Sequence, residues 1–362
     1  MTMTKRKIIT VVNAASPVSI EFYEFGCERS QSQPNEDNVL IVLDVVSPDF
    51  SKEFQTRAFE SGLRTYECDG SYWALWRSLR NELVECRSAL IHVHMGRSGV
   101  AAQLIGLMHS PFSPRVYTLH TMFKEYRLVH KVLSVANVAL ARCTVFVSSS
   151  ARDAFPTLLR KIAGRCRVIS NGVKFAETRV TQSRKKRFLL NVGRLVPAKN
   201  QAWLVQLMTE LPDYSLHIVG DGELRNELES LAGKIGVVDR IHFWGMVSRQ
   251  RVRDLMEEAS IFVSSSVREG MPVAVLEALS VGLPVVLSDI APHQEIANLI
   301  SGVQISKARK QAWVDGIASI DGLERSGYDQ LSMSLKRATS EHFSIDSTYR
   351  RYTNLYNELL GL

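Results

Sequence analysis

Two glutamates, Glu269 and Glu277, mark the part of this sequence whose residue types and spacing are best suited to chemistry. Glu269 follows Ile261–Val263, an apolar β-branched run that is typical of a buried strand. Pro272 suits the first position of a helix that contains Glu277 and ends near Gly282. The spacing therefore predicts one carboxylate just before a helix and another about one and a half turns inside it.

A helix start of this kind predicts an anion site. The amides of Gly270, Met271 and Val273 lie at the positive end of the helix dipole, where phosphate groups bind. Carboxylates repel phosphate, so the two glutamates are better suited to accept hydrogen bonds from hydroxyl groups attached to it. A ligand with phosphate in its middle and polyols at both ends, such as a nucleotide-sugar, fits this arrangement. The alternative is that each glutamate is simply solvated at the helix surface.

The elements that must position these residues follow a regular pattern. Short apolar runs alternate with longer helix-like segments, which is typical of parallel sheets covered by helices. The first series of expected strands is Ile8–Val12, Val39–Leu43, Ala89–Val93, Val116–Leu119, Val145–Val147 and Val168–Ile169. The second series is Phe188–Val192, Leu216–Val219, Ile241–Phe243, Ile261–Val263, Val285–Leu287 and Val303–Ile305. Two such series predict two doubly wound domains with a cleft between them, and ligands bind beyond the carboxyl ends of the strands.

Four consecutive strand ends of the second series carry glycine or charge. They are Gly193, Arg194 and Lys199 after the first strand, Gly220 and Gly222 after the second, Gly245 and Met246 after the third, and Glu269 after the fourth. A single glycine there usually makes a turn, and a single cation is usually solvated. On one edge of one sheet, however, these loops together predict a binding site, and the two cations in one loop favour phosphate.

Composition sets wider limits. The chain has 362 residues, 45% hydrophobic and 22% charged, which is enough for two domains with substantial cores. No apolar run approaches the ~20 residues of a membrane-spanning helix, and the first residues predict a strand rather than a secretory signal. Five scattered cysteines without a Cys-x-x-Cys pair favour buried free thiols in a reducing compartment over a zinc site. These features predict a cytoplasmic protein.

The net charge of +7 suits nucleic acid, anionic lipid or acidic ligands. The sequence has no RNA-binding aromatic signature, zinc finger or helix-turn-helix pattern, which argues against nucleic acid. Basic and apolar residues mix in Tyr126–Leu133, and Trp73 and Trp76 have helical spacing, so both segments suit peripheral contact with a membrane. The alternative for both is a helix packed on a core.

Several of these motifs resemble glycosyltransferase family 4. The matching residues are Gly193-Arg194 with Lys199-Asn200, Val219-Gly-Asp-Gly222, Phe243-x-Gly245, Glu269-Gly-Met-Pro272 with Glu277, and Gly282-x-Pro284. The resemblance is strong over Val168–Gly302. In the first half, His92–Gly99 and Thr118–His120 resemble members that build bacterial surface polysaccharides.

The resemblance implies the GT-B fold, in which two doubly wound Rossmann-like α/β domains face each other across a cleft. Residues 1–172 would form an N-terminal acceptor-side domain, and residues 173–342 a C-terminal domain that binds the nucleotide-sugar. Residues 343–362 would form a helix that crosses back to the first domain. The first strand ends without the paired glycines that many relatives carry near the acceptor, so the acceptor side departs from the family pattern.

The resemblance also implies catalytic roles for Glu269, Arg194, Lys199 and His120. Arg194 and Lys199 would hold the donor diphosphate, while Glu269 would accept hydrogen bonds from hydroxyls of the donor sugar. His120 would face that sugar from the opposite domain, and Glu277 would bind the ribose diol. The other expected donor-binding residues are Gly193, Gly222, Gly245, Met246, Gly270, Met271, Pro272 and Val273.

His94 and Arg97 are the expected acceptor-side residues. His92 and His94 would point to one face of a strand and could chelate a metal ion, but they have no third ligand in the sequence. This favours packing beside a polar group that faces the cleft. Arg97 would either meet an anionic acceptor or point into solvent.

The expected activity is retaining, metal-independent transfer of a sugar from a nucleotide-sugar to a hydroxyl of a glycan or lipid-linked acceptor, in bacterial surface polysaccharide biosynthesis. No cofactor is expected, because the sequence has no Asp-x-Asp pair for a divalent ion and Arg194 and Lys199 could replace it. Two alternatives stay open. One is a nucleotide-sugar epimerase on the same fold, and the other is a donor-binding scaffold subunit without catalysis.

Overall fold

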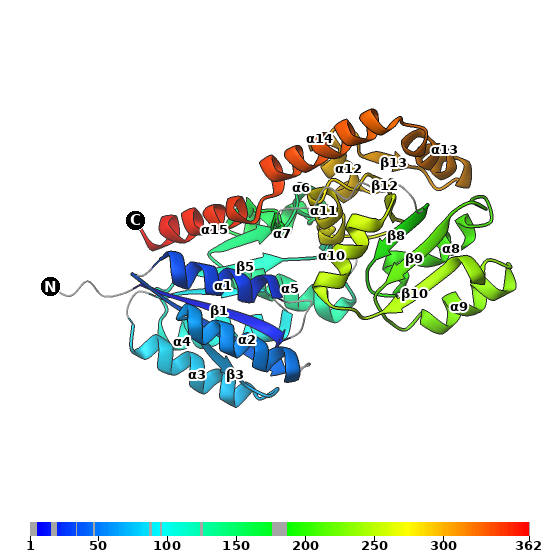
Figure 1. Ribbon diagram of the computed structural model, residues 1–362. Helices are drawn as coiled ribbons and strands as arrows, with labels where there is room; N and C mark the ends of the chain where they lie inside the picture. Colours follow the sequence, from blue (N-terminus) through cyan, green and yellow to red (C-terminus); the bar gives the residue numbers. More distant parts are fainter. Residues whose placement is uncertain are drawn as a thin grey trace. The chain divides into compact units, whose positions relative to one another are not determined.

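The computed structural model describes residues 6–15, 20–33, 35–45, 48–86, 89–94, 96–123, 126–175 and 187–361 (Figure 1). The chain divides into two compact units, each with its own parallel sheet. The first unit comprises Met1–Ile169 and Tyr349–Leu362, and the second comprises Ser170–Thr348. The sequence predicted domain boundaries after residues 172 and 342, whereas the two units of the structure change over after Ile169 and Thr348.

The first unit contains a parallel sheet whose described strands follow the order β3-β2-β1-β4-β5-β6-β7. The strands are β1 (Arg6–Ala15), β2 (Glu36–Val45), β3 (Arg64–Glu67), β4 (Ala89–Val93), β5 (Arg115–Leu119), β6 (Cys143–Phe146) and β7 (Arg165–Val168). The helices are α1 (Ile20–Ser32), α2 (Pro48–Ser61), α3 (Tyr72–Val84), α4 (Gly96–His109), α5 (Leu128–Leu140), α6 (Ser149–Asp153), α7 (Thr157–Ile162) and, from Tyr349 onward, α15 (Ile345–Leu360).

Alternate residues of these strands enter two different cores, as the period of a strand requires. Ile9 and Ile91 face a core that includes side chains of α3, α4 and α5. Ile8 and Leu90 face the other side of the sheet, where α15 packs with Leu355 and neighbouring residues beside α1 (Figure 1). Because both faces are covered, the central strands are apolar almost throughout.

The second unit contains a parallel sheet whose described strands follow the order β10-β9-β8-β11-β12-β13. The strands are β8 (Phe188–Val192), β9 (Ser215–Val219), β10 (Ile241–Gly245), β11 (Ile261–Ser264), β12 (Val285–Ser288) and β13 (Gln304–Ser306). The helices are η3 (Pro197–Lys199), α8 (Gln201–Leu207), α9 (Arg225–Lys234), η4 (Val238–Arg240), α10 (Arg249–Glu258), α11 (Val273–Ser280), α12 (Ala291–Leu299), α13 (Lys310–Asp321) and α14 (Arg325–Phe343).

Helices cover both faces of this sheet as well. Side chains of α8, α9 and α13 share one core with Leu189, Ile218 and Val263, while α11 packs with α14 on the other side (Figure 1). The strand order reverses between β8 and β11, which are hydrogen-bonded neighbours. In open parallel sheets such a reversal opens a crevice at the carboxyl ends of the two strands, and ligands bind there.

Each expected strand overlaps an observed one, but the two edges of the first sheet were predicted poorly. The strand β3 was missed, and the last strand was expected at Val168–Ile169 although β7 spans Arg165–Val168. Both are short edge strands with half-exposed polar residues, so they lack the apolar run that marks a buried strand. The prediction for Pro272 was also wrong by one position, because Pro272 is the N-cap and the helix begins at Val273.

A buried ion-pair network fastens the edge strand β3 to the rest of the first unit. Glu82, on α3, has a side chain that is 2% exposed and accepts hydrogen bonds from Lys7 Nζ at 2.7 Å and Tyr66 Oη at 2.5 Å. Arg64 donates to both carboxylate oxygens, at 2.9 and 2.8 Å. Burial alone would raise the pKa of Glu82, but these hydrogen bonds and positive charges outweigh it and hold the pKa below its usual value.

We expect Glu82→Gln to lower the free energy of unfolding by about 3 kcal/mol, because it removes the buried counter-charge of Lys7 and leaves only the more exposed carboxylates of Asp37 and Glu85 near it. A carboxylate with a depressed pKa stabilises the fold above its unfolded pKa, and this contribution is lost as pH falls through the folded pKa. The difference between wild type and variant should therefore be constant from pH 5 to 7 and shrink below about pH 4. Urea unfolding followed by circular dichroism measures it. Glu85→Gln, at a side chain that is 68% exposed, is the matched control and should change little. Equal effects of the two variants would contradict this account.

Candidate functional site

The loops after four strands of the second unit are joined by backbone hydrogen bonds. The amide of Gly193 donates to Val219 O at 2.9 Å, and the amide of Gly220 donates to Gly245 O at 2.9 Å. On the other side, the amide of Val267 donates to Ala198 O at 2.9 Å. The carboxyl ends of β10, β9, β8 and β11 therefore form one continuous edge, as the four glycine-bearing and charged loops had suggested.

Two glycines of this edge have no room for a side chain. A Cβ on Gly220 would lie 2.1 Å from Gly193 O, and Gly220 also has φ of +125°. A Cβ on Gly222 would lie 2.4 Å from Leu195 O. The loop after β9 thus lies directly against the loop after β8, and only glycine permits this close approach.

Lys199 and Glu269 meet at the point where the strand order reverses. Lys199 ends the short helix η3 after β8, and Glu269 lies in the loop after β11. Lys199 Nζ donates to Glu269 Oε1 at 2.5 Å, and the two side chains are 25% and 10% exposed. Of the expected catalytic residues, these two are in direct contact.

The loop after β8 carries both Lys199 and Arg194. Asn200, next to Lys199, has φ of +51°, a left-handed conformation that asparagine tolerates better than most residues. This turn lies between η3 and α8. The Lys199 side chain passes Gly193, with its Cε 3.5 Å from where a Cβ on Gly193 would be. The Arg194 side chain is exposed and makes no hydrogen bond or ion pair with another described residue, so its charge is available to a ligand.

The start of α11 contributes amides to the same edge. Met271, Pro272 and Gly270 are buried, and within the described chain the amides of Met271 and Val273 donate to no backbone or side-chain acceptor. Glu277 lies farther along α11 and is half-buried. The amides and Glu277 thus occupy the helix positions that the sequence suggested, although the helix starts one residue later.

At the loop after β10, Met246 is 65% exposed and Gly245 has a left-handed φ of +66°. Arg225, from the first turn of α9, donates to Phe243 O at 3.4 Å. Its guanidinium lies 3.2 Å from where a Cβ of Gly245 would be. Sequence reasoning did not assign Arg225 a role, because its contact with this loop depends on how α9 packs beside β10.

Two further polar residues near Glu269 were also missed. Ser266 Oγ donates to Glu269 Oε1 at 2.7 Å. His293, near the start of α12, is fully buried and lies next to Ser288, the last residue of β12. The run of three serines after β11 was a visible signal for Ser266. Nothing local in the sequence marks His293.

In the first unit, the structure brings His94 and His120 together. His94 follows β4 and His120 follows β5, and His94 Nδ1 lies 3.1 Å from His120 Nε2. Burial lowers the pKa of His120 to about 4, and burial together with the charges of His92 and His120 lowers that of His94 well below its usual value. Both rings are therefore neutral at pH 7, and one donates to the other.

His92 has a different environment from its neighbours. Its Nδ1 lies 2.6 Å from Tyr356 Oη and its Nε2 lies 2.8 Å from Thr118 Oγ1, so both ring nitrogens are used within the fold. Burial, with a smaller effect of His120, lowers the pKa of His92 to about 3. Among the described residues, no group of three or more His, Cys, Asp or Glu side chains could hold a metal ion. His92 is thus a structural residue that ties β4 to α15.

Arg97 lies in the first turn of α4 and is exposed. It belongs to the first unit with His94 and His120, whereas Arg194, Lys199, Glu269 and Glu277 belong to the second. The expected acceptor-side residues and donor-side residues thus form two separate groups.

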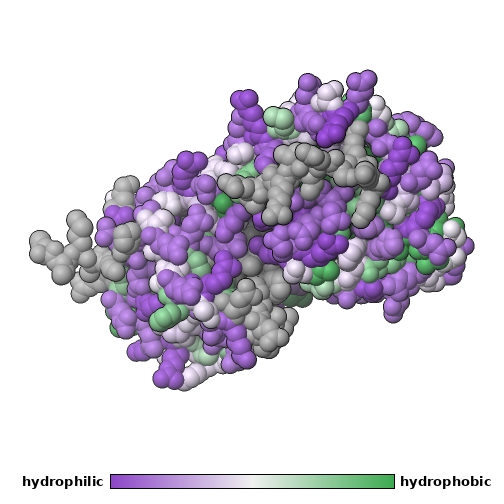
Figure 2. Space-filling view, viewed as in Figure 1, coloured by the Kyte–Doolittle hydropathy of each residue, from purple (hydrophilic) through white to green (hydrophobic). Residues whose placement is uncertain are grey.

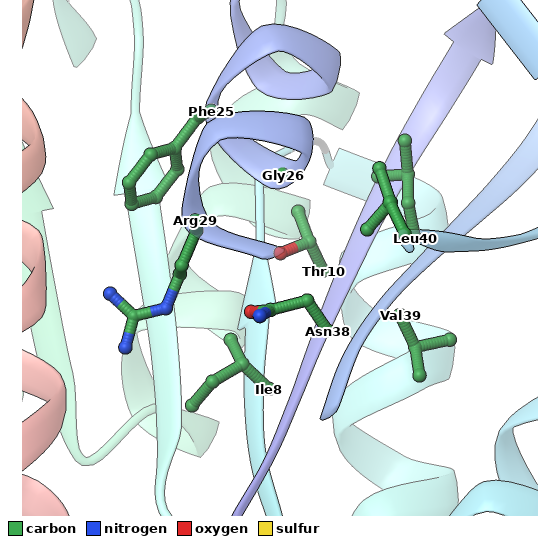
Figure 3. A pocket seen from close by; sticks show the side chains of 9 residues that line it. Ile8, Thr10, Phe25, Gly26, Arg29, Asn38, Val39 and Leu40 are labelled. Atoms are coloured by element: carbon green, nitrogen blue, oxygen red, sulfur yellow. The ribbon is translucent and has the colours of Figure 1, made fainter. Parts of the chain in front are cut away.

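Two cavities in the described part of the chain contain none of these residues. One lies in the first unit between α1 and strands β1 and β2, with Arg29, Thr10 and Asn38 among its lining side chains (Figure 3). At about 10 Å³ it has the size of a single water molecule. The other, of about 200 Å³, lies at the amino ends of β8 and β11 beside Arg187 and Tyr328. That edge of the sheet is opposite to the one that carries Lys199 and Glu269.

Comparison with known proteins agrees with this arrangement. Residues 41–177 match the family described as Glycosyltransferase Family 4, and residues 174–326 match the family described as Glycosyl transferases group 1. HepE of Anabaena, solved in complex with UDP and glucose, superimposes with a TM-score of 0.79 at 15% identity, covering 98% of this chain and 100% of HepE.

Two curated relatives have named activities. The UDP-Gal:alpha-D-GlcNAc-diphosphoundecaprenol alpha-1,3-galactosyltransferase of Escherichia coli is 28% identical over 249 residues, which is 60% of this chain and 61% of that protein. The GDP-mannose:cellobiosyl-diphosphopolyprenol alpha-mannosyltransferase of Xanthomonas campestris is 29% identical over 205 residues, 54% of each chain. In both cases the chain spans less than two thirds of the relative's length.

Two parallel sheets of this order match the GT-B fold, which HepE shares. The two family matches follow one another along the sequence and together run from residue 41 to residue 326. Together with the two parallel sheets, these matches identify the chain as a GT-B glycosyltransferase similar to family 4.

Proposed function

We propose that this protein transfers a sugar from a nucleotide-sugar to a hydroxyl of a glycan or lipid-linked acceptor, with retention at the anomeric carbon and without a metal ion. The observation that carries the proposal is the contact between Lys199 and Glu269 at the β8–β11 reversal. There, a cation suited to phosphate and a carboxylate suited to sugar hydroxyls lie side by side, so one ligand with phosphate next to its sugar could reach both.

Breaking a glycosyl–phosphate bond leaves negative charge on the nucleotide diphosphate and positive character on the sugar. Arg194, Lys199 and the amides at the start of α11 would stabilise the departing diphosphate, and one such donor is typically worth about 2.7–4 kcal/mol in the barrier. Glu269 would accept hydrogen bonds from the sugar and stabilise its positive character. Glu277 would bind the ribose, and the loop at Gly245 and Met246 would lie along the base.

Retention is proposed on the family resemblance and on the state of Glu269. Its Oε1 oxygen accepts hydrogen bonds from both Lys199 Nζ and Ser266 Oγ. A carboxylate stabilised in this way is a poor nucleophile, which favours a route in which the acceptor hydroxyl attacks on the side that the diphosphate leaves. His94 and His120, both neutral, would contribute from the acceptor-side unit.

The acceptor is proposed from the relatives and from the surface of the first unit. The E. coli and Xanthomonas relatives are named for acceptors linked through diphosphate to polyprenols. A polyprenol-linked glycan for bacterial surface polysaccharide is therefore the proposed acceptor class. Such a substrate lies in the membrane, and we propose that the protein works in the cytoplasm at the inner membrane face.

The membrane contact would use α5. Leu128, Val129 and Val132 are 77%, 55% and 61% exposed and fall on one side of this helix, next to the exposed Arg127. Trp73, on α3, is 64% exposed, whereas Trp76 packs against the core. In the described chain no helix is long and apolar enough to cross a membrane. The surface seen in Figure 2 is mainly hydrophilic with small hydrophobic patches, so any contact there would be limited in area.

We expect Glu269→Gln to reduce sugar transfer at least a hundredfold while nucleoside diphosphate binds as tightly as before or more tightly. The variant keeps an amide oxygen but loses the charged acceptor for sugar hydroxyls, and it removes the negative charge beside Lys199. The assay uses a membrane extract as acceptor, with the donor chosen by thermal shift among UDP-, GDP-, ADP- and dTDP-sugars. Glu341→Gln, in an exposed pair with Arg337, is the control. Unchanged turnover of Glu269→Gln would remove Glu269 from the site, an epimer formed from donor alone would indicate an epimerase, and binding without transfer would indicate a scaffold.

We expect transfer to proceed at an unchanged rate in excess EDTA, because Arg194, Lys199 and the α11 amides supply the positive charge that a divalent ion would otherwise provide. The rate is measured with the same labelled donor before and after chelation. Loss of activity in EDTA, with recovery on adding Mg²⁺ or Mn²⁺, would contradict metal independence.

We expect the protein to bind vesicles that contain anionic lipid, and Val132→Glu to weaken this binding at least tenfold, because the change places a negative charge in the apolar side of α5. Co-sedimentation with vesicles of 30% phosphatidylglycerol measures the affinity. Met333→Glu, at a residue of α14 that is 72% exposed, is the matched control. Equal binding of all three proteins would argue against α5 as the contact.

A further inference from the structure

His293 has an unusual hydrogen-bonding state for a buried residue. It lies in the first turn of α12 and is 0% exposed. Its Nδ1 lies 2.9 Å from Ser288 O and 3.2 Å from Ser288 Oγ. Its Nε2 is buried and has no hydrogen-bond partner among the described residues.

These contacts determine which ring nitrogen carries the proton. Ser288 O is a carbonyl and can only accept. Ser288 Oγ has one proton, and it donates that proton to Ser266 O at 2.5 Å, so toward His293 it can also only accept. Nδ1 must therefore be the protonated nitrogen. Burial lowers the pKa of His293, so the ring is neutral at pH 7 and Nε2 is left as an unprotonated acceptor.

The proton on Nδ1 is the first link of a chain that ends at Glu269. His293 Nδ1 donates to Ser288 Oγ at 3.2 Å, Ser288 Oγ donates to the carbonyl of Ser266, and Ser266 Oγ donates to Glu269 Oε1 at 2.7 Å. The same carboxylate oxygen accepts from Lys199 Nζ. Each link is a direct hydrogen bond within the second unit, and the chain joins the end of β12 and the start of α12 to the loop after β11.

We propose that His293, as its Nδ1–H tautomer, is a positioning residue that holds Ser266 and Glu269 in place for sugar transfer. This rests on the proposed role of Glu269 as the acceptor for hydroxyls of the donor sugar. The backbone carbonyl of Ser266 accepts a hydrogen bond from Ser288 Oγ, and the hydroxyl of Ser266 donates one to Glu269. Without the bond from His293, Ser288 is free to turn toward other acceptors and the loop after β11 loses one of its supports.

The unpartnered Nε2 supports a functional role over a purely structural one. A buried acceptor without a partner costs about 1–3 kcal/mol of stability, which an apolar side chain of similar size would not incur. Such groups in native structures call for an explanation, and a catalytic site is a common one. In this state Nδ1 is a rigidly held donor, and the unprotonated Nε2 has no proton that could pass to Glu269 or Lys199.

The test compares His293→Asn with His293→Gln. The amide nitrogen of asparagine can occupy the position of Nδ1 and donate to Ser288, while glutamine reaches toward Nε2 instead. Glutamine is closer to histidine in volume, so packing alone favours His293→Gln. We expect His293→Asn to keep kcat within about threefold of wild type and His293→Gln to lower kcat by roughly ten- to a hundredfold. Nucleoside diphosphate affinity should stay within about threefold in both, because Arg194 and the α11 amides are unchanged.

Three further measurements separate positioning from loss of stability. Ile296→Ala, at a fully buried residue of the same helix, should lower the melting temperature but leave kcat at 20 °C unchanged. Ser288→Ala removes the next link with little change in volume and should lower kcat as His293→Gln does. Nitrogen-15 NMR of the wild-type histidines, with His293 assigned by its disappearance in His293→Asn, should show a protonated Nδ1 and an unprotonated Nε2.

The outcomes are distinguishable. If His293→Gln and Ser288→Ala transfer sugar at the wild-type rate while Glu269→Gln does not, the positioning role is wrong and the proposed function stands. If Glu269→Gln is also active, both are wrong. A protonated Nε2 in the wild type, or a loss in His293→Asn equal to that in His293→Gln, would overturn the role of the Nδ1 proton.

Discussion

The second unit depends on the reversal of strand order between β8 and β11. These two strands are parallel neighbours, so their carboxyl ends lie at the same edge of the sheet. The connections that follow them lead to helices on opposite faces, because α8 shares the core of one face and α11 packs with α14. The two loops must therefore diverge, and the space between them is where Lys199 and Glu269 meet. The strand order thus determines where the candidate site lies, and the side chains determine what it can bind.

The remaining parts of this edge serve the same arrangement. Gly220 and Gly222 allow the loop after β9 to lie against the loop after β8, which carries Arg194 and Lys199. Ser288 is hydrogen-bonded to the backbone of Ser266, in the loop after β11, and Ser266 is hydrogen-bonded to Glu269. One carboxylate oxygen of Glu269 therefore accepts both from Lys199, in the loop after β8, and from Ser266, in its own loop.

The placement of the candidate-site loops was predictable from the sequence where the signal is local. A glycine or charged residue directly after an apolar strand can be recognised in the sequence alone. Because the strands are parallel, the loops that follow them lie at the same edge of the sheet. The edge strand β3 was missed because its residues Arg64–Glu67 are polar, and its position depends on a distant partner, Glu82 on α3. Arg225 was missed for the same kind of reason, since its partner Phe243 lies 18 positions away. His293 has a near partner, Ser288, but its burial and its place beside Glu269 depend on tertiary packing. The two histidines in and directly after β4 looked alike in sequence, yet His92 is hydrogen-bonded to Tyr356, 264 positions away, while His94 is hydrogen-bonded to His120.

The helix α15 has a further consequence for how the chain acquires its structure during synthesis. One face of the first sheet is covered by Leu355, Tyr356 and Leu359, and the residues from 170 to 348 form the other unit before these are made. At a translation rate of about 5–20 residues per second, the gap of about 180 residues corresponds to roughly 9–36 seconds. During that interval Ile8, Leu90 and Val116 would be exposed to water on the ribosome. The first unit to be synthesised is thus the last to be completed, and its nascent form is a natural client for a chaperone.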